Sequence, residues 1–202
     1  MRLEAQTSQS QPNDPQQAGV TIREAASPDA RALADLRVRT WRAAYRGLLP
    51  DALLDGLDAA SAEERWRARI ADSSSWTLVG EQQGRVVGFV TCGASRDEGV
   101  SAWEGEVHAL YVSPELWGRG YGHALLQAAL ERLRAEGRCE VVLWMLRGNR
   151  RAQHFYVRQG FALDGGARQI AHSSGVLLDE VRYRRVLVPG DTRTGLKDDL
   201  QT

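Results

Sequence analysis

Several features that commonly signal a function are scarce in this sequence. Its 202 residues include only two cysteines, Cys92 and Cys139, which lack C-x-x-C spacing, so a disulfide framework is excluded. Both fall in expected strands, where we expect buried free thiols. The four histidines show no spacing typical of metal ligands. We therefore expect no metal site.

Neither charge nor hydrophobicity marks the chain for a nucleic acid or a membrane. Its 26 basic and 26 acidic residues give a formal net charge of zero, which argues against bulk electrostatic binding to nucleic acid or acidic lipid. No apolar run approaches the ~20 residues that a membrane-spanning helix needs. The polar N-terminus lacks the apolar core of a signal peptide. These absences predict a cytoplasmic protein.

The two ends of the chain differ in composition from the middle. Residues 1–18 are rich in Gln, Ser and Pro and predict a disordered tail. Residues 189–202 are charged and polar and predict a flexible C-terminal tail. Between them, residues 19–188 are expected to form one domain without internal repeats, in line with the length and the 43% hydrophobic content.

Hydrophobic periodicity within the domain alternates between helix and strand. Helices are expected at 27–45, 50–54, 59–70, from about 123 to Gly137, and at 150–159, the first with Ser27 as its N-cap. Strands are expected at 20–23, 76–81, 85–92, around 107–112, and at 140–146, 161–163 and 180–188. Gln83-Gly84 should form a hairpin turn, and a loop rich in Gly, His and Ser should join the last two strands.

The most informative stretch runs from the strand at 107–112 into the helix that follows it. Gly118, Gly120 and Gly122 alternate between Ser113-Pro114, which stops the strand, and the apolar helical repeat. Glycine permits φ > 0 and lets backbone amides approach a ligand, so this turn predicts a phosphate site at a helix N-terminus. The alternative is a loop that needs glycine only for its shape.

Two common phosphate motifs do not fit this turn. A dinucleotide fingerprint fails because His123 stands where its third glycine belongs, and because the next acid, Glu140, starts the following strand rather than ending it. A P-loop fails because no Gly-Lys is followed by Ser or Thr.

Two segments instead resemble a known family. LYVSPELWGRGYGHALL, from Leu110, is similar to the acetyl-coenzyme A motif of the GNAT superfamily of N-acetyltransferases. NRRAQHFYVRQGF, from Asn149 to Phe161, resembles the family signature N-x-x-A-x-x-(F/L)-Y-x-x-x-G-F. The resemblance spans about residues 20–187. One departure is Trp117, where the family often has Arg or Gln; we expect little effect, because backbone amides make most of the phosphate contacts.

The resemblance implies a single α/β (α+β) domain with a mixed, mostly antiparallel central sheet, flanked by helices and splayed at the central strand pair. It implies a bacterial, small-molecule-type enzyme that transfers an acetyl group from acetyl-CoA to a primary amine by direct attack in a ternary complex. Pyrophosphate would contact the backbone of Trp117, Gly118, Arg119, Gly120, Tyr121, Gly122 and His123. The pantetheine arm would contact Leu110, Tyr111, Val112 and Asn149.

Catalytic roles follow from the same resemblance and from strand geometry. Tyr156 would be the general acid, with a core aromatic as the alternative. Glu106 and His108 are two residues apart, so they should share one side of their strand and are candidate general bases. Glu104 is expected to face solvent. Some relatives place a glutamate base five residues before the asparagine, but that position here is Trp144.

The acceptor should bind between the first helices and the late hairpin. Trp41 and Tyr45, four residues apart on the first helix, are expected to line this pocket, as are Trp66 and Trp103; core packing is the more common role for each. Four basic residues near the motifs could meet the 3′-phosphate of the cofactor or form a solvated basic face: Arg119, Arg150, Arg151 and His154.

Three functions remain open at this point. The first is acetylation of a small amine, the second acetylation of a protein or peptide, and the third a non-catalytic acyl-CoA sensor. An enclosed aromatic pocket would favour a small molecule, and an open acidic groove a peptide. The chain keeps both the glycines and Tyr156, which argues against the sensor. The sequence also leaves a homodimer open.

Overall fold

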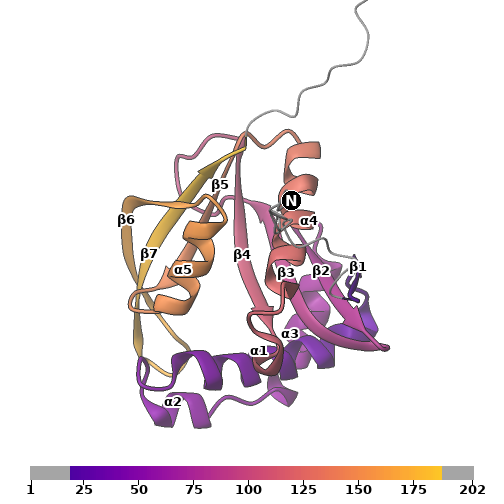
Figure 1. Ribbon diagram of the computed structural model, residues 1–202. Coiled ribbons are helices and arrows are strands. Elements are labelled where there is room, and N and C mark those ends of the chain that lie inside the picture. The colour runs from indigo at the N-terminus through magenta and orange to yellow at the C-terminus, as the bar shows by residue number, and fades with distance from the viewer. Residues whose placement is uncertain (1–18, 188–202) are drawn as a thin grey trace, which may run out of the picture.

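The computed structural model describes residues 19–187, so the expected tails at 1–18 and 189–202 lie outside the described residues. One seven-stranded sheet has the order β1-β2-β3-β4-β5-β7-β6, with helices on both faces (Figure 1). Neighbouring strands are antiparallel except for the parallel pair β4 and β5. The expected mixed, mostly antiparallel sheet is therefore confirmed.

The elements follow the expected order along the chain. The strands are β1 (Thr21–Glu24), β2 (Ser75–Gln82), β3 (Arg85–Ala94), β4 (Glu104–Val112), β5 (Glu140–Leu146), β6 (Ala162–Ala171) and β7 (Leu177–Val186). The helices are α1 (Ala30–Tyr45), α2 (Asp51–Asp55), α3 (Ala60–Ala71), α4 (Tyr121–Ala135) and α5 (Arg150–Arg158). Short 3-10 turns occupy Ser27–Asp29 and Pro114–Leu116.

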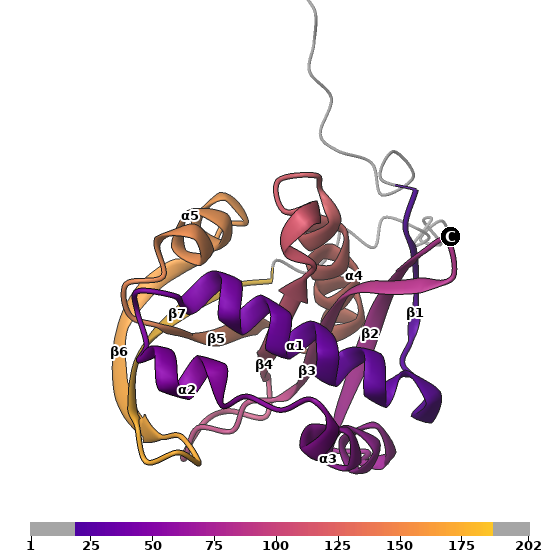
Figure 2. The same cartoon turned by 90° about the horizontal axis from the view of Figure 1, so that it is seen from below.

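Hydrophobic side chains fill a layer on each face of the sheet. On one face α4 and α5 pack against the strands, and the apolar stripe of α4 expected from the sequence is buried there, with Leu126, Leu130 and Leu133 fully inaccessible. On the other face α1 and α3 pack over β2 and β3, around Phe89. Figure 2 shows α1 crossing the sheet on the face opposite α4 and α5.

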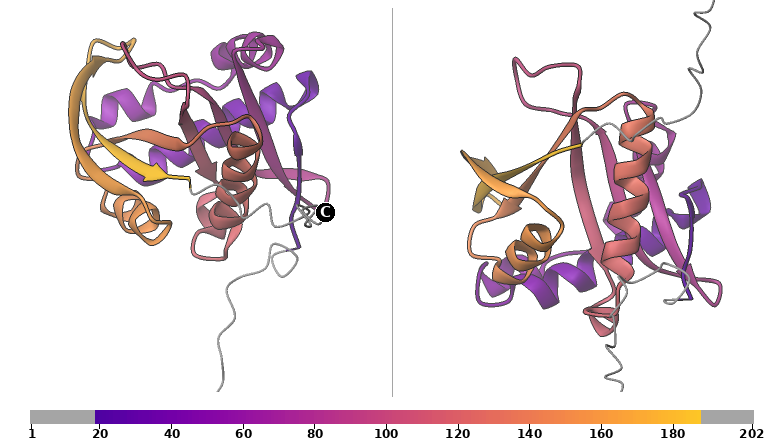
Figure 3. Two further views of the ribbon diagram at one scale, coloured as in Figure 1. Left: turned by 90° about the horizontal axis from the view of Figure 1, so that it is seen from above. Right: turned by 45° about the horizontal axis from the view of Figure 1, so that its top comes forward.

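The central strand pair separates after a short paired stretch. β5 pairs with β4 only from Glu104–Val107 against Glu140–Leu143, although β4 continues to Val112. Figure 3 shows the two strands diverging from this point. The splay expected at the central pair is thus present, and it leaves one edge of β4 without a neighbouring strand.

Three local expectations are wrong. Ala26, not Ser27, occupies the N-cap of the first helical turn, because the Asp29 carboxylate accepts the Ala26 N–H at 2.8 Å and orders the turn. Cys139 is exposed, since it precedes β5 instead of lying in a strand, whereas Cys92 is buried as expected. The Gly/His/Ser-rich loop is mostly strand, because β6 and β7 extend to a turn at residues 172–176.

Other expectations hold closely. Gln83 and Gly84 have φ of 51° and 74°, as the two central positions of a tight hairpin turn require. β5 has the expected bounds, and Gly137 follows α4 in the left-handed region at φ 81°. Within residues 19–187, no helix is both long and apolar enough to cross a lipid bilayer.

Candidate functional site

The glycine turn lies between the end of β4 and the start of α4. Gly118 and Gly120 have φ of 77° and 86°, and Gly120 is the N-cap residue of α4. The Trp117 indole N–H donates to the Val112 carbonyl at 2.8 Å and holds the turn against the end of the strand. The first amides of α4 are therefore helix N-terminal donors without an intrahelical partner, close to the end of β4, an arrangement that binds anions.

Gly118 and Gly122 differ in what the fold requires of them. A Cβ on Gly118 would have nothing within 4 Å, so its glycine serves the backbone conformation alone. Gly122 lies inside α4, and a Cβ there would meet the Phe155 ring at 3.5 Å and Val112 Cγ2 at 3.7 Å, which are ordinary contacts. Neither packing nor backbone conformation requires glycine at position 122.

Side chains around the turn are mostly engaged with the protein or with solvent. The Tyr121 hydroxyl accepts from Gln82 Nε2 at 2.6 Å, and His123 Nδ1 lies 2.8 Å from Gln159 Oε1. The Arg151 guanidinium stacks 4.3 Å from the Trp117 ring centroid. Four basic residues near the turn are exposed: Arg119, Arg150, Arg151 and His154.

The open edge of β4 begins at an irregularity. Thr91 pairs with Ala109 and Cys92 with Val107, so His108 is an extra residue with no partner on β3. Beyond it, Leu110, Tyr111 and Val112 pair with β3 on one side only, since β5 has already separated. No strand of the described residues occupies the other side, so an extended ligand can bind there as an added strand would, although the Val112 carbonyl already accepts the Trp117 indole N–H.

Asn149 and Tyr156 lie on the element that faces this edge. Asn149 Oδ1 accepts the Ala152 N–H at 3.2 Å, so its expected capping role is confirmed. Tyr156 is buried, with its ring packed edge-on against Phe155 and Phe161 at centroid distances of 5.1 and 5.7 Å. Burial raises the pKa of the Tyr156 hydroxyl, so it stays protonated.

Aromatic side chains from α1 and β4 contact one another, and Tyr156 of α5 is close enough to affect the pKa of Tyr45. We call Trp41, Tyr45, Tyr111 and Tyr156 the aromatic cluster. Trp41 packs edge-on against Tyr45 at 5.1 Å, and its indole N–H donates to the Tyr111 hydroxyl at 2.8 Å. Burial raises the pKa of Tyr45, and the nearby Tyr111 and Tyr156 raise it further. The bond from Trp41 to Tyr111 therefore joins α1 to β4.

The two candidate bases lie in different environments. Glu106 is fully buried, and its carboxylate accepts the Arg96 backbone N–H at 2.9 Å and the Arg96 guanidinium. His108 has a side chain only 6% exposed, with Nε2 at 3.9 Å from a Glu106 oxygen. The two side chains therefore share one side of β4, as expected.

His108 is held in one tautomer. Its Nε2 lies 3.1 Å from the carbonyl oxygen of Ala94, and because a carbonyl only accepts, Nε2 must carry the proton. The lone pair of the neutral ring is then on Nδ1. Burial lowers the pKa of His108, and the Arg96 charge lowers it further. His108 is therefore an uncharged base near pH 7.

Two other expectations near this strand are wrong. Glu104 does not face solvent: it is buried, and its carboxylate pairs with Arg184 at 2.7 Å, an arginine on the distant strand β7. Trp103 is 64% exposed, so it belongs neither to the core nor to an enclosed pocket.

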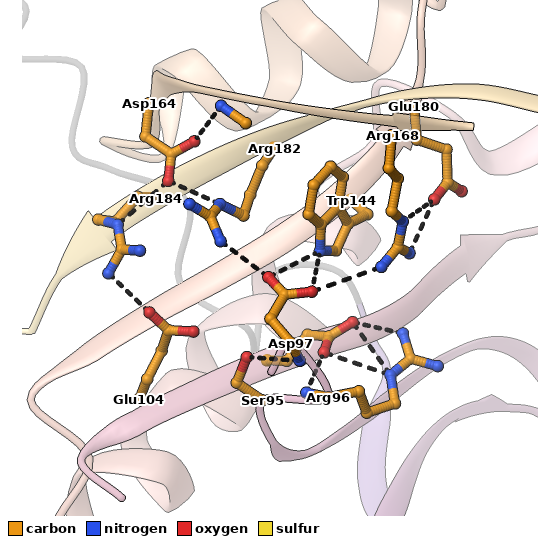
Figure 4. Close-up of polar contacts among 12 residues, drawn as sticks. Ser95, Arg96, Asp97, Glu104, Trp144, Asp164, Arg168, Glu180, Arg182 and Arg184 are labelled. Carbon is orange, nitrogen blue, oxygen red and sulfur yellow. Dashed lines mark hydrogen bonds and ion pairs between the residues drawn. The ribbon is translucent and has the colours of Figure 1, made fainter. Parts of the chain in front are cut away.

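A polar network holds the β3–β4 loop against the last three strands (Figure 4). The Asp97 carboxylate accepts the Trp144 indole N–H at 3.1 Å and Arg182 Nη1 at 2.8 Å. Arg168 stacks 4.1 Å from the Trp144 ring centroid and lies 3.5 Å from Asp97. The Trp144 indole therefore holds the β3–β4 loop in place through Asp97. The sequence carried no signal of this network, because its members come from separate elements.

A groove of about 680 Å³ opens on the α1 face, between α1, α2, α3 and the β6–β7 turn. Trp66 lines it, while its ring also packs edge-on against Phe89 at 5.0 Å. Trp41 and Tyr45 do not line the groove. Trp41 lies directly behind its wall, with Arg37 4.1 Å and His172 5.7 Å from its ring centroid. The expected position between the first helices and the late hairpin is thus occupied by a real groove.

Comparison with known proteins assigns the chain and its fold to one family. The Acetyltransferase (GNAT) family model matches residues 33–161, which include the glycine turn and the Asn149–Phe161 segment. The chain belongs to this family, and is an acyltransferase by that membership.

Individual relatives agree with the assignment. An uncharacterized N-acetyltransferase of Bacillus subtilis is 30% identical over 162 residues, covering 80% of this chain and 90% of its own. An L-methionine sulfoximine/L-methionine sulfone acetyltransferase of Pseudomonas paraeruginosa is 30% identical over 124 residues, covering 61% and 71%. The PaiA N-acetyltransferase of Thermoplasma acidophilum, solved in complex with coenzyme A, shares the fold with a TM-score of 0.66 at 18% identity, covering 83% and 99%.

Proposed function

We propose that the chain transfers an acetyl group from acetyl-CoA to the primary amine of a small molecule, by direct attack in a ternary complex. The observation that carries this proposal is the open edge of β4, which leads directly into the glycine turn at the N-terminus of α4. A long ligand with a diphosphate at one end fits this combination. Family membership supports acetyl-CoA as that ligand.

In this proposal the backbone does most of the cofactor binding. Amides from Trp117 to His123 hold the pyrophosphate, and Leu110 to Val112 pair with the pantetheine arm as though it were a strand. The side chains of Tyr121 and His123 already have protein partners, which supports a backbone role for both residues. Asn149 contacts the pantetheine beside its capping bond. The thioester then lies in the splay, near Tyr156.

The reaction balances with the groups present. The neutral amine attacks the thioester carbonyl carbon, so a C–N bond forms and the C–S bond breaks. Tyr156, whose pKa is raised by burial, gives its proton to the departing thiolate, and the proton that the attacking nitrogen loses returns to the Tyr156 oxygen through water. The products are the amide and free coenzyme A. Backbone amides on the open edge of β4 can stabilise the carbonyl oxygen as it gains charge.

Of the two candidate bases we favour His108. Glu106 is sealed from solvent and already neutralised by Arg96, so it is poorly placed to take a proton directly. His108 keeps a free Nδ1 lone pair and a pKa below its usual range. It can take the ammonium proton of the acceptor, directly or through water, while the Ala94 carbonyl holds the ring.

A small acceptor is favoured over a protein or peptide. The groove has the volume of an ordinary small-molecule site and is walled by Trp66. It contains three arginines against one aspartate, which does not match the acidic open groove expected for a peptide acceptor. A relative named for acting on L-methionine sulfoximine and L-methionine sulfone points in the same direction.

The test combines turnover with a variant at Gly122. Purified protein is mixed with acetyl-CoA and a panel of small amines, and released thiol is followed. In Gly122→Ala the added methyl makes only ordinary contacts at 3.5 Å, so the protein should fold with unchanged or slightly higher stability. We expect acetyl-CoA affinity to fall about tenfold or more, because the methyl meets the bound diphosphate.

Glu131→Ala, an exposed position on the same helix, is the matched control and should bind acetyl-CoA normally. Unchanged affinity in Gly122→Ala would remove the turn from cofactor binding. Binding without any thiol release, hydrolysis included, would favour the non-catalytic sensor instead.

A further inference from the structure

The groove on the α1 face holds three arginines without acidic partners. Within residues 19–187, no carboxylate oxygen lies within 4.0 Å of a guanidinium nitrogen of Arg37, Arg65 or Arg69. Arg67, on the same helix as two of them, pairs with both Glu63 and Glu64. In the described part of the chain, the positive charge inside the groove is therefore unpaired, while that of Arg67 on the same helix is paired with carboxylates.

The one acid in the groove does not balance this charge. Both carboxylate oxygens of Asp58 accept backbone N–H groups, from Ala60 at 3.1 Å and Ser61 at 2.9 Å, at the start of α3. These bonds lower the pKa of Asp58 and commit it to the helix. Burial lowers the pKa of Arg69, and repulsion by Arg96 and Arg37 lowers it further. The groove is thus a positively charged site, with Arg65 and Arg69 exposed to solvent.

The arginines lie close to side chains of the candidate site. The charge of Arg69 is close enough to His108 to help lower its pKa. Arg37 stacks on Trp41, and the Trp41 indole donates to the Tyr111 hydroxyl inside the aromatic cluster. A molecule in the groove therefore lies beside Arg37, which contacts the Trp41 that is hydrogen-bonded to Tyr111.

We propose that the acceptor is a small amine that also carries an oxyanion, a carboxylate or a phosphate, and that Arg37, Arg65 and Arg69 bind this oxyanion in the groove. The inference depends on the acetyl transfer proposed above. A guanidinium offers two parallel N–H donors that match the oxygens of either anion. The positive groove also disfavours an ammonium ion, so it selects the neutral amine that attacks the thioester. Polyamines should be poor acceptors.

The first test compares matched acceptors by released thiol at fixed acetyl-CoA. L-Glutamate, L-phenylalanine and L-methionine are each paired with their carboxamide, O-phosphoethanolamine is paired with ethanolamine, and spermidine is added as a cation. We expect kcat/KM to be about 10- to 100-fold higher for the anionic member of at least one pair, the size of a charge-assisted hydrogen bond. A preference in the amino-acid pairs identifies a carboxylate, and a preference in the phosphate pair identifies a phosphate.

The second test assigns the effect to the groove. Arg37→Gln, Arg65→Gln and Arg69→Gln should each raise KM for the preferred anionic acceptor about tenfold or more, with little effect on its uncharged partner. Arg67→Gln, on α3 but paired outside the groove, is the matched control and should behave as wild type. The acetyl-CoA dissociation constant should be unchanged in all four variants.

Failure of this inference and failure of the proposed function give different results. Suppose that acetyl-CoA binds, that spermidine or amines without an oxyanion have the same kcat/KM as the anionic acceptors, and that KM is unchanged in all three arginine variants. The acetyl transfer then stands and the oxyanion site is wrong. The site is also wrong if only peptides are acetylated. If acetyl-CoA itself does not bind, the proposed function fails first, and the inference fails with it.

Discussion

Tyr156 combines a buried ring with a hydroxyl that the protein leaves available. No hydrogen bond from a residue between 19 and 187 contributes to its shifted pKa, so the hydroxyl is not needed to hold the core. Tyr156→Phe keeps the contacts with Phe155 and Phe161 and should leave stability close to wild type. Turnover should fall by about 10²-fold, as for loss of a general acid, while acetyl-CoA affinity changes little.

Steady-state kcat and a direct acetyl-CoA titration together check this prediction. Tyr183→Phe serves as the control, because Tyr183 is buried in the same core but lies outside the aromatic cluster. Equal turnover in Tyr156→Phe and wild type would leave Tyr156 as a packing residue only.

His108 gives a prediction about pH. Its pKa lies below the ordinary value of about 6.5, because burial and Arg96 disfavour the charged ring. The neutral base is therefore fully present near pH 7 and above, and is lost as pH falls through the lowered pKa. We expect kcat/KM of wild type to decrease on that acidic side only below about pH 6.5.

His108→Asn should lower kcat/KM near pH 7 and remove this acidic decrease, because no ring remains to be protonated. The check is a pH–rate profile of both proteins with the same acceptor, an amine that lacks an oxyanion. Ionisation of this amine then affects both profiles equally. A profile in the variant that keeps the same acidic decrease would assign that ionisation to another group.

At the scale of elements, α4 and β5 were predictable because their signals are local. The apolar repeat of α4 and the closing Gly137 lie within one short stretch, and the structure uses each as expected. The hairpin of β6 and β7 was predicted far too short. β6 is exposed along most of its length, so it shows no hydrophobic alternation. Cross-strand pairs such as Arg168–Glu180 at 2.8 Å support it instead.

In the candidate site, too, the features formed by neighbouring residues were predictable and those formed by distant residues were not. The glycine turn and the Asn149 cap could be read from the sequence because each is formed by neighbouring residues. The position of the groove was expected, but its lining was not, since its walls come from three helices and a distant turn. Arg37 and Arg69 carried no motif, and the burial of Glu104 depends on an arginine 80 residues away on β7.

The Asp97 network links several elements, so it should contribute measurably to the free energy of unfolding. Asp97 is 15% exposed in its side chain and serves Trp144 and Arg182 together. Asp97→Asn keeps the shape of the side chain but removes the charge that Arg168 and Arg182 face. We therefore expect the free energy of unfolding to fall by about 1–3 kcal/mol. Denaturant unfolding measures it. Asp35→Asn breaks an exposed pair with Arg31 and should cost below about 1 kcal/mol; an equal loss in both would contradict the argument.

At the scale of the whole molecule, the central sheet has two parts that are joined by a short stretch of strand pairing. Strands β1 to β4 and strands β5 to β7 share only the pairing of Glu104–Val107 with Glu140–Leu143. Beyond it, ion pairs such as Glu104–Arg184 and Asp97–Arg182 cross from one part to the other. A ligand bound along the open edge of β4 and contacting Asn149 would add contacts across the same division.

Acetyl-CoA should therefore stabilise the whole chain against heat. A ligand that binds only the folded state contributes about 2.7 kcal/mol at 100 times its dissociation constant, which for a chain of this size raises Tm by about 5–10 °C. We expect a single unfolding transition that shifts upward as acetyl-CoA is added, measured by calorimetry. In Gly122→Ala the unliganded Tm should match wild type while the shift shrinks, because the weakened diphosphate contact raises the dissociation constant. A shift of equal size in both proteins would mean that the ligand is held elsewhere on the fold.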